Sequence, residues 1–329
     1  MPKVSIIVPC YNEQRFIGAT LNAIYTQTFP RADMEVVIAD SHSTDSTREV
    51  IADFQRSHPD LALTLVDNDR RAIPSALNRA LEAARGGIVV RMDAHSTPYP
   101  DYVENSVRAL EEGRGDNVGG VWEIRPGGRG WMAESIAAAA AHPLGAGDAG
   151  YRLNSAAGPK DTVPFGAFRR SLVERIGGYD ESLLSNEDYE FNARVRASGG
   201  VVWLEPSIRS VYYARGSLGA LARQYGRYGF WKLQMLRRYP FTLRWRQALP
   251  PLFVASILAL AALSFLDIVR AALILELGIY LSVLLTAGLL ASVRQRKFFL
   301  VPGLPLAILV MHVAWGGGFL WSLITAFRK

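Results

Sequence analysis

The chain has 329 residues, enough for one large domain or two ordinary ones, and a formal net charge of +6. No nucleic-acid recognition motif accompanies this positive charge, so nucleic acid is not an expected partner. The single cysteine, Cys10, excludes an internal disulfide and fits a reducing compartment.

The first ninety residues alternate between short apolar runs and amphipathic stretches. The apolar runs predict strands at residues 4–8, 35–39, 61–66 and 87–92. Helices are expected between them, over residues 13–27 with Asn12 as N-cap, from Ser43 or Thr44 to residue 55, and from Pro74 to residue 86. This order implies an α/β fold with parallel strands. Ligands bind such sheets at the carboxyl ends of the strands, where Asp40 and Asp93 would converge on one crevice.

Asp93-Ala94-His95 directly follows the fourth predicted strand. A carboxylate and an imidazole on alternate residues can hold one divalent metal and leave coordination positions for phosphate oxygens. The pattern therefore favours a metal-diphosphate site and, with it, a nucleotide-activated substrate. The alternative is a turn with an aspartate cap and an incidental histidine.

Two further motifs stand at the ends of the first two strands. The first strand leads into Pro9-Cys10-Tyr11-Asn12-Glu13, which lacks the glycine pattern of a dinucleotide fold, so a dehydrogenase is not expected. The second ends in Asp40-Ser41-His42-Ser43-Thr44-Asp45. Together with Asp93-Ala94-His95, these motifs resemble those of the family 2 glycosyltransferases, over roughly residues 3–232. Arg91-Met92-Asp93-Ala94-His95 is also similar to subfamilies that build succinoglycan-type exopolysaccharide.

The resemblance implies a GT-A nucleotide-sugar-binding fold with a mainly parallel sheet. Pro9, Tyr11 and Glu13 would line the nucleotide pocket, and Asp40 would accept a hydrogen bond from the uracil or the ribose. Asp93 and His95 stand at the metal-binding positions, although the family commonly has a second aspartate where this chain has a histidine. Imidazole is a better ligand for Mn²⁺ than for Mg²⁺, so we expect Mn²⁺ or Mg²⁺ with Asp93 and His95 as metal ligands.

An acidic segment, Asn186-Glu187-Asp188-Tyr189-Glu190, opens a helix that is expected to end near residue 199. Inverting sugar transfer needs a carboxylate that takes the proton from the attacking acceptor hydroxyl. Asp188 matches the Glu-Asp motif of the family and is the candidate base, with Glu187 the next candidate. The alternative is a solvated helix start, where acidic residues are favoured in any case.

The segment Gln224-Tyr225-Gly226-Arg227-Tyr228 resembles the Gln-x-x-Arg-Trp element of membrane-bound family members, with Tyr228 in place of the tryptophan. Gln224, Arg227 and Lys232 are therefore expected to bind the donor, with Arg227 and Lys232 neutralising its diphosphate. A compatible interpretation is an amphipathic helix in which the aromatic and basic residues of 223–246 lie along the lipid surface.

Three stretches near the C-terminus, at residues 248–266, 271–293 and 300–327, contain at most one charged residue each. Each reaches about the 20 residues that a helix needs to cross a bilayer. With three spans, the basic clusters before the first and between the second and third would share the cytoplasmic side, and Arg328 and Lys329 would lie outside. No signal peptide is expected. The expected domains are a cytoplasmic catalytic domain over 1–232, an interfacial segment over 233–247 and an anchor over 248–329.

These features predict a multi-pass protein of the bacterial inner membrane with a cytoplasmic, metal-dependent catalytic domain. It would move a hexose with inversion from a UDP-sugar to a lipid-linked saccharide, in the synthesis of exopolysaccharide or another cell-surface glycan. Two alternatives remain, namely a polyprenyl-phosphate sugar transferase and a non-catalytic component of a polysaccharide export complex.

Overall fold

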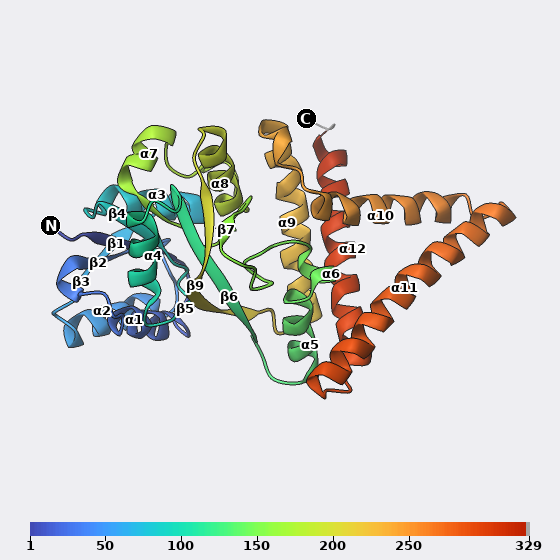
Figure 1. Cartoon of the computed structure of the whole chain (residues 1–329), viewed down its shortest axis with the longest axis horizontal. Coiled ribbons are helices and arrows are strands. Elements are labelled where there is room, and N and C mark those ends of the chain that lie inside the picture. The colour runs from blue at the N-terminus through green and yellow to red at the C-terminus, as the bar shows by residue number, and fades with distance from the viewer. Residues whose placement is uncertain (327–329) are drawn as a thin grey trace. The chain divides into compact units, whose positions relative to one another are not determined.

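The computed structural model describes residues 1–326 and divides the chain into two compact units (Figure 1). The sheet unit comprises Met1–Glu123 and Ala149–Tyr212. The helical unit comprises Ile124–Asp148 and the chain from Tyr213 onward. The division falls within two long strands, so neither unit is one uninterrupted piece of sequence.

The first half of the sheet unit is a parallel α/β sheet in the order β3-β2-β1-β4. Its strands are β1 Val4–Cys10, β2 Met34–Asp40, β3 Ala62–Asp67 and β4 Ile88–Arg91. The helices between them are α1 Ile17–Tyr25, α2 Thr47–Ser57 and α3 Ile73–Ala83, and the short 3₁₀ helix η1 Arg31–Asp33 precedes β2. Alternate strand residues enter opposite hydrophobic cores, with Ile6 in the core that includes Ile17 of α1 and Ile7 in the core that includes Leu77 of α3. The predicted alternation of strands and helices is confirmed.

The second half of the sheet is antiparallel and continues the order as β8-β6-β9-β5, with β7 paired to β9. These strands are β5 Thr97–Pro98, β6 Asn117–Pro126, β7 Gly158–Pro159, β8 Ala167–Arg169 and β9 Val202–Ala214. The remaining helices of this unit are α4 Tyr102–Glu111, α7 Arg170–Ile176 and α8 Glu187–Ala197. Because β8 joins β4 and α8 follows soon after it in the sequence, this half brings the acidic start of α8 to the end of the parallel sheet.

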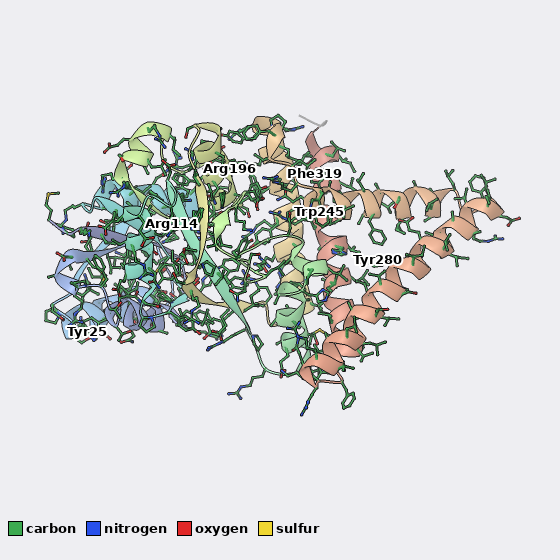
Figure 2. All side chains as sticks on the ribbon, in the orientation of Figure 1. Tyr25, Arg114, Arg196, Trp245, Tyr280 and Phe319 are labelled. Carbon is green, nitrogen blue, oxygen red and sulfur yellow. The ribbon has the colours of Figure 1, made fainter. Side chains whose placement is uncertain are left out.

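The second unit is mainly helical (Figure 1). It contains α5 Trp131–Ala140, α6 Pro143–Ala146, α9 Leu218–Arg238, the 3₁₀ helix η2 Pro240–Thr242, α10 Trp245–Ala262, α11 Asp267–Gln295 and α12 Leu300–Ala326. Helices α5 and α9 pack along α12, whereas α10 and α11 project away from it and meet at their far ends. Figure 2 shows side chains extending from α10 and α11 on all sides. The labelled Trp245 marks the start of α10, and the labelled Tyr280 lies on α11.

The three predicted apolar segments are all helices, and each is long and apolar enough to cross a membrane. The first begins three residues earlier than predicted, at Trp245. Position 327 of the third predicted segment, together with Arg328 and Lys329, falls outside the described residues. The structure also groups α9 with the apolar helices, so the position expected to separate a catalytic domain from an interfacial segment, residue 232, lies inside one continuous helix.

Candidate active site

A fully buried arginine, Arg91, gathers three carboxylates at the end of β4. Its side chain is 2% exposed. One guanidinium nitrogen, Nη2, donates to Asp93 Oδ1 at 2.9 Å and to Glu187 Oε1 at 3.0 Å, and Nη1 donates to Asp188 Oδ2. A buried arginine of this kind is stabilised by its charged partners and in turn fixes their positions. The structure therefore brings Asp93 together with the adjacent pair Glu187 and Asp188, although more than ninety residues separate them in sequence.

The start of α8 places Asp188 inside this cluster. Asn186 has a left-handed backbone with φ of 68°, which turns the chain directly into the helix that Glu187 begins. Burial raises the pKa of the Asp188 carboxyl to about 7. Arg91 opposes this rise, while the negative charges of Glu187 and Asp93 reinforce it. Asp188 is still 23% exposed, so this carboxyl combines access with a pKa suited to proton transfer near neutral pH.

Phe165 forms one side of the cluster. Its ring lies under the Arg91 guanidinium, with the guanidinium carbon 5.2 Å from the ring centroid, and its backbone N–H donates to Asp188 Oδ2 at 3.4 Å. The residue has a positive φ of 48°, which is uncommon for a bulky side chain. An aromatic ring and a backbone donor thus help to hold Arg91 and Asp188 in place.

Asp93 and His95, the two predicted metal ligands, both follow the end of β4. Asp93 is 21% exposed and keeps a carboxylate at the end of β4, and the imidazole of His95 stands two residues further along. His95 Nδ1 lies 2.9 Å from Glu13 Oε1. Metal-binding histidines are commonly oriented by a carboxylate at their other ring nitrogen in this manner. Residues 1–326 contain no group of three or more histidine, cysteine or acidic side chains able to enclose a metal, so a cation here would share its coordination with a ligand.

Two predicted helix caps are wrong. Asn12 was expected to cap the first helix, but that helix begins at Ile17, and Asn12 Oδ1 instead accepts from Thr44 N–H at 2.8 Å. Ser43 or Thr44 was expected to cap the second helix, but that helix begins at Thr47, and Ser43 Oγ instead accepts from Asn12 N–H at 2.8 Å. The physical reason is competition, because hydroxyl and amide side chains can bond to a neighbouring loop as well as to their own helix. These motif residues therefore tie the loops after β1 and β2 together.

The residues expected to line the nucleotide pocket occupy the same two loops or the strand ends beside them. Pro9 is buried in β1, and Tyr11 is 40% exposed with the Arg71 guanidinium carbon 5.2 Å from its ring centroid. Asp40 is completely buried at the end of β2. Its carboxylate accepts from Ser43 N–H and Arg48 Nη1, each at 3.0 Å. Asp40 therefore already holds the loop and Arg48 in place, which is a structural role distinct from the expected contact with uracil or ribose.

Gln224, Arg227 and Lys232 all lie on α9, in the helical unit. Arg227 is exposed. Gln224 is buried, and its side-chain Nε2 donates to Tyr228 Oη at 2.9 Å. Lys232 is 1% exposed, and its Nζ donates to Thr242 O at 3.1 Å. This contact joins α9 to η2, so the burial of Lys232 favours a structural role over the expected neutralisation of a diphosphate.

The chain is similar to known glycosyl transferases. A family model described as glycosyl transferase family 2 matches residues 5–177. The succinoglycan biosynthesis protein ExoA of Rhizobium meliloti (strain 1021) is 30% identical, over 98% of this chain and 96% of that protein.

Two further relatives are informative. The dolichyl N-acetyl-α-D-glucosaminyl phosphate 3-β-D-2,3-diacetamido-2,3-dideoxy-β-D-glucuronosyltransferase of Methanococcus voltae is 26% identical, over 98% of this chain and 97% of that protein. The solved mannosyltransferase PcManGT from Pyrobaculum calidifontis, in complex with GDP-Man and Mn²⁺, has a TM-score of 0.64 and 27% identity, over 97% of this chain and 87% of that one.

Proposed function

The chain belongs to glycosyl transferase family 2, and we propose that it transfers a hexose, with inversion, from a nucleoside diphosphate sugar to a lipid-linked saccharide. The observation that carries this proposal is the Arg91 cluster. It places one carboxylate with a raised pKa, Asp188, beside a second, Asp93, at the carboxyl end of a parallel sheet. The family model and the Rhizobium meliloti relative establish the family, and the related mannosyltransferase structure supports the expected GT-A fold.

Asp188 acts as the general base in this proposal. The acceptor hydroxyl oxygen forms a bond to the anomeric carbon of the sugar, and its proton passes to the Asp188 carboxylate. The bond between the anomeric carbon and the diphosphate oxygen breaks, and the electron pair leaves with the nucleoside diphosphate. Arg91 and the Phe165 N–H hold Asp188 in position during this transfer. Glu187, which shares Arg91, is the next candidate for the base.

Asp93 and His95 are the proposed ligands of Mn²⁺ or Mg²⁺, with Glu13 orienting the imidazole. When bound, the cation would neutralise negative charge on the departing diphosphate. Support comes from the donor set of one carboxylate and one imidazole and from the Mn²⁺ in the related mannosyltransferase structure. Tyr11, Pro9, Asp40, Gln224 and Arg227 remain proposed donor-binding residues.

The proposed acceptor is a lipid-linked saccharide, and the proposed site of action is the cytoplasmic face of a bacterial inner membrane. Three candidate membrane spans and the name of the Methanococcus voltae relative, which includes a dolichyl-linked sugar phosphate, support a lipid acceptor. A polyprenyl-phosphate acceptor is the alternative within this class. The ordered cluster of Arg91, Asp93 and Asp188 argues against a non-catalytic export component.

A donor screen tests the proposed function directly. Detergent-purified full-length protein is mixed with UDP- and GDP-hexoses and a lipid-linked saccharide, with and without Mn²⁺, and release of free nucleoside diphosphate is measured. We expect release from a UDP-hexose that depends on the acceptor. Release from GDP-mannose alone would correct the nucleotide, and failure to bind or cleave any donor would favour the non-catalytic alternative.

The pKa of Asp188 predicts how the rate depends on pH. The base works only when it is deprotonated, and its pKa is raised to about 7. The turnover rate should therefore rise as the pH increases through about 7 and fall about tenfold for each pH unit below it. The measurement is the kcat for donor cleavage between pH 5 and 9 at saturating metal. A rate that stays constant from pH 5 to 8 would exclude a base with this pKa.

Replacing His95 by aspartate should change the metal preference. A carboxylate oxygen is a harder ligand than an imidazole nitrogen, so His95→Asp should raise the activity with Mg²⁺ relative to that with Mn²⁺. Donor cleavage is titrated with each metal separately. His42→Asn is the matched control, because His42 is half-exposed and pairs with the exposed Asp69. An unchanged ratio of the two metal activities in His95→Asp would remove His95 from the ligand set.

A further inference from the structure

Helix α12 is apolar enough to cross a membrane, yet it packs along α9, which carries several arginines. We propose that only α10 and α11 cross the bilayer, as a helical hairpin, and that α12 lies along the membrane surface. In this arrangement α5, α6 and α9 cover the water-facing side of α12. The C-terminal end of α12 then stays on the same side of the membrane as the start of α10.

The second half of α12 packs closely against α9. A Cβ atom added at Gly229 would collide with the carbonyl oxygen of Trp315, and one at Gly318 would collide with that of Gly226. Further along, Gln234 Nε2 donates to Ser322 Oγ at 3.0 Å. The partners on α12 advance from Ala314 and Gly318 beside Gly226, through Trp315 and Phe319 beside Gly229, to Ser322 beside Gln234, so the two helices run parallel from residue 226 to 234 of α9. Any position of α12 across the bilayer would take α9 with it.

Helix α9 cannot lie within hydrocarbon. Arg223, Arg227, Arg237 and Arg238 are all exposed. Positions 227 and 237 lie about 15 Å apart along the helix axis, which is roughly half of the 30 Å hydrocarbon thickness. The arginines at the two ends of this segment therefore cannot both reach headgroups on opposite sides, and charged side chains within the core are strongly disfavoured. A surface position satisfies all four arginines.

The first half of α12 is covered in the same way by α5 and α6. A Cβ atom at Gly303 would collide with Ser135 Oγ of α5. His312 Nε2 lies 2.8 Å from the carbonyl oxygen of Leu144 in α6. Helix α5 also carries Glu134, which pairs with Lys297 just before α12 at 2.6 Å. From Gly303 to Ser322, about the length that a crossing needs, α12 is thus packed against α5, α6 and α9 rather than left free for lipid on every side.

Helices α10 and α11 have the opposite character. Ser256 Oγ donates to Glu276 Oε1 at 2.6 Å and the Phe253 and Tyr280 rings stack at 4.3 Å, so the two helices support each other and Glu276, the acidic side chain in the middle of α11, has a partner. The first turn of α11, next to the connection, carries the exposed ion pair of Asp267 and Arg270. That pair needs water or headgroups, which a complete crossing supplies on the far side.

Their lengths also suit a hairpin. The 18 residues of α10 and the 29 of α11 extend about 27 Å and 44 Å as helices, which fits one upright and one tilted crossing. The basic residues Arg244, Arg294 and Lys297 flank the two open ends of the hairpin. They then share one side of the membrane, as the positive-inside tendency requires.

The test uses the full-length protein in a bacterial host and does not depend on enzymatic activity. Green fluorescent protein or alkaline phosphatase is fused after residue 329, because the former fluoresces only when retained in the cytoplasm and the latter is active only after export. We expect a fluorescent first fusion and an inactive second fusion. An active phosphatase with a dark fluorescent protein would place the C-terminus outside and overturn the proposal in favour of three crossings.

Single cysteines test the hairpin in the same host. Cys10→Ser removes the one native cysteine, and Phe265→Cys and Phe298→Cys then report on the two ends of α11, where the native side chains are 73% and 88% exposed. We expect a membrane-impermeant maleimide to label Phe265→Cys in intact spheroplasts and Phe298→Cys only after lysis. Labelling of Phe265→Cys only after lysis would show a re-entrant hairpin and overturn the two crossings. Labelling of Phe298→Cys before lysis would reverse the orientation and contradict the positive-inside argument.

Discussion

Asp188→Asn is expected to lower the turnover rate by ~10² to 10⁴ while donor binding survives. Asparagine keeps the size of the side chain and can still accept a hydrogen bond from Arg91, but it cannot take the proton of the acceptor hydroxyl. The loss should therefore appear in kcat, with little change in the dissociation constant of the donor. The measurement pairs steady-state cleavage with direct binding of the nucleoside diphosphate. The rise of activity through about pH 7 should also disappear from the residual rate.

Asp53→Asn is the matched control for this substitution, because Asp53 is an exposed aspartate of α2 whose ion-pair partner is Arg56 on the same helix. It makes the same chemical change away from the cluster and should leave kcat unchanged. A near-wild-type rate for Asp188→Asn would move the role of base elsewhere. Glu187→Asn and Glu187→Gln would then be measured, since Glu187 shares the guanidinium of Arg91.

Local sequence patterns were sufficient to predict the parallel half of the sheet. Residues 4–8 and 35–39 are apolar runs of strand length, and strand formation there depends on burial of the run itself. The two helix starts after them were wrong because Asn12 and Ser43 bond to each other's loops, 31 residues apart. A cap predicted from neighbouring residues cannot anticipate such a partner, because the partner lies in another loop.

The site shows the same division between local and long-range information. Asp93, His95 and Asp188 were identifiable because each stands in a short motif, but nothing local to them shows that Arg91 joins the first to the third. The one available signal was a charged residue in an apolar strand, since a buried arginine requires several acidic partners. The backbone contact of Phe165 with Asp188 likewise depends on the tertiary fold, so no local pattern predicts it.

Composition also could not predict how residues 223–246 pack in the helical unit. Its aromatic and basic composition predicted a helix at the lipid surface, and composition alone treats such a helix as a separate segment. The glycines at 226 and 229 are the feature that changes this interpretation, since they allow α9 to approach α12 at backbone distance. Helix packing of this kind depends on two surfaces far apart in sequence, so it becomes visible only in the folded unit.

Asp93→Asn is the second substitution with a large expected effect. The amide keeps an oxygen that can accept from Arg91 but loses the charge that would bind a divalent cation. Turnover should fall by ~10²-fold or more, because removal of an interaction that stabilises developing charge costs about this much. The Mn²⁺ concentration that gives half-maximal activity should rise as well. The measurement is donor cleavage as a function of Mn²⁺ concentration, with an EDTA-treated sample as reference.

Asp69→Asn serves as the control for Asp93→Asn, because Asp69 is 95% exposed and its ion-pair partner is the half-exposed His42. The two possible causes of a loss at Asp93 can be separated by the pH profile. If Asp93 acts through the cation, the residual rate should still rise through about pH 7, because the contact between Asp188 and Arg91 persists. If it acts mainly by fixing Arg91, the profile should shift and the Mn²⁺ requirement should not. Equal activity of the wild-type protein in EDTA and in Mn²⁺ would contradict the metal site altogether, and Asp93 would then be a structural partner of Arg91.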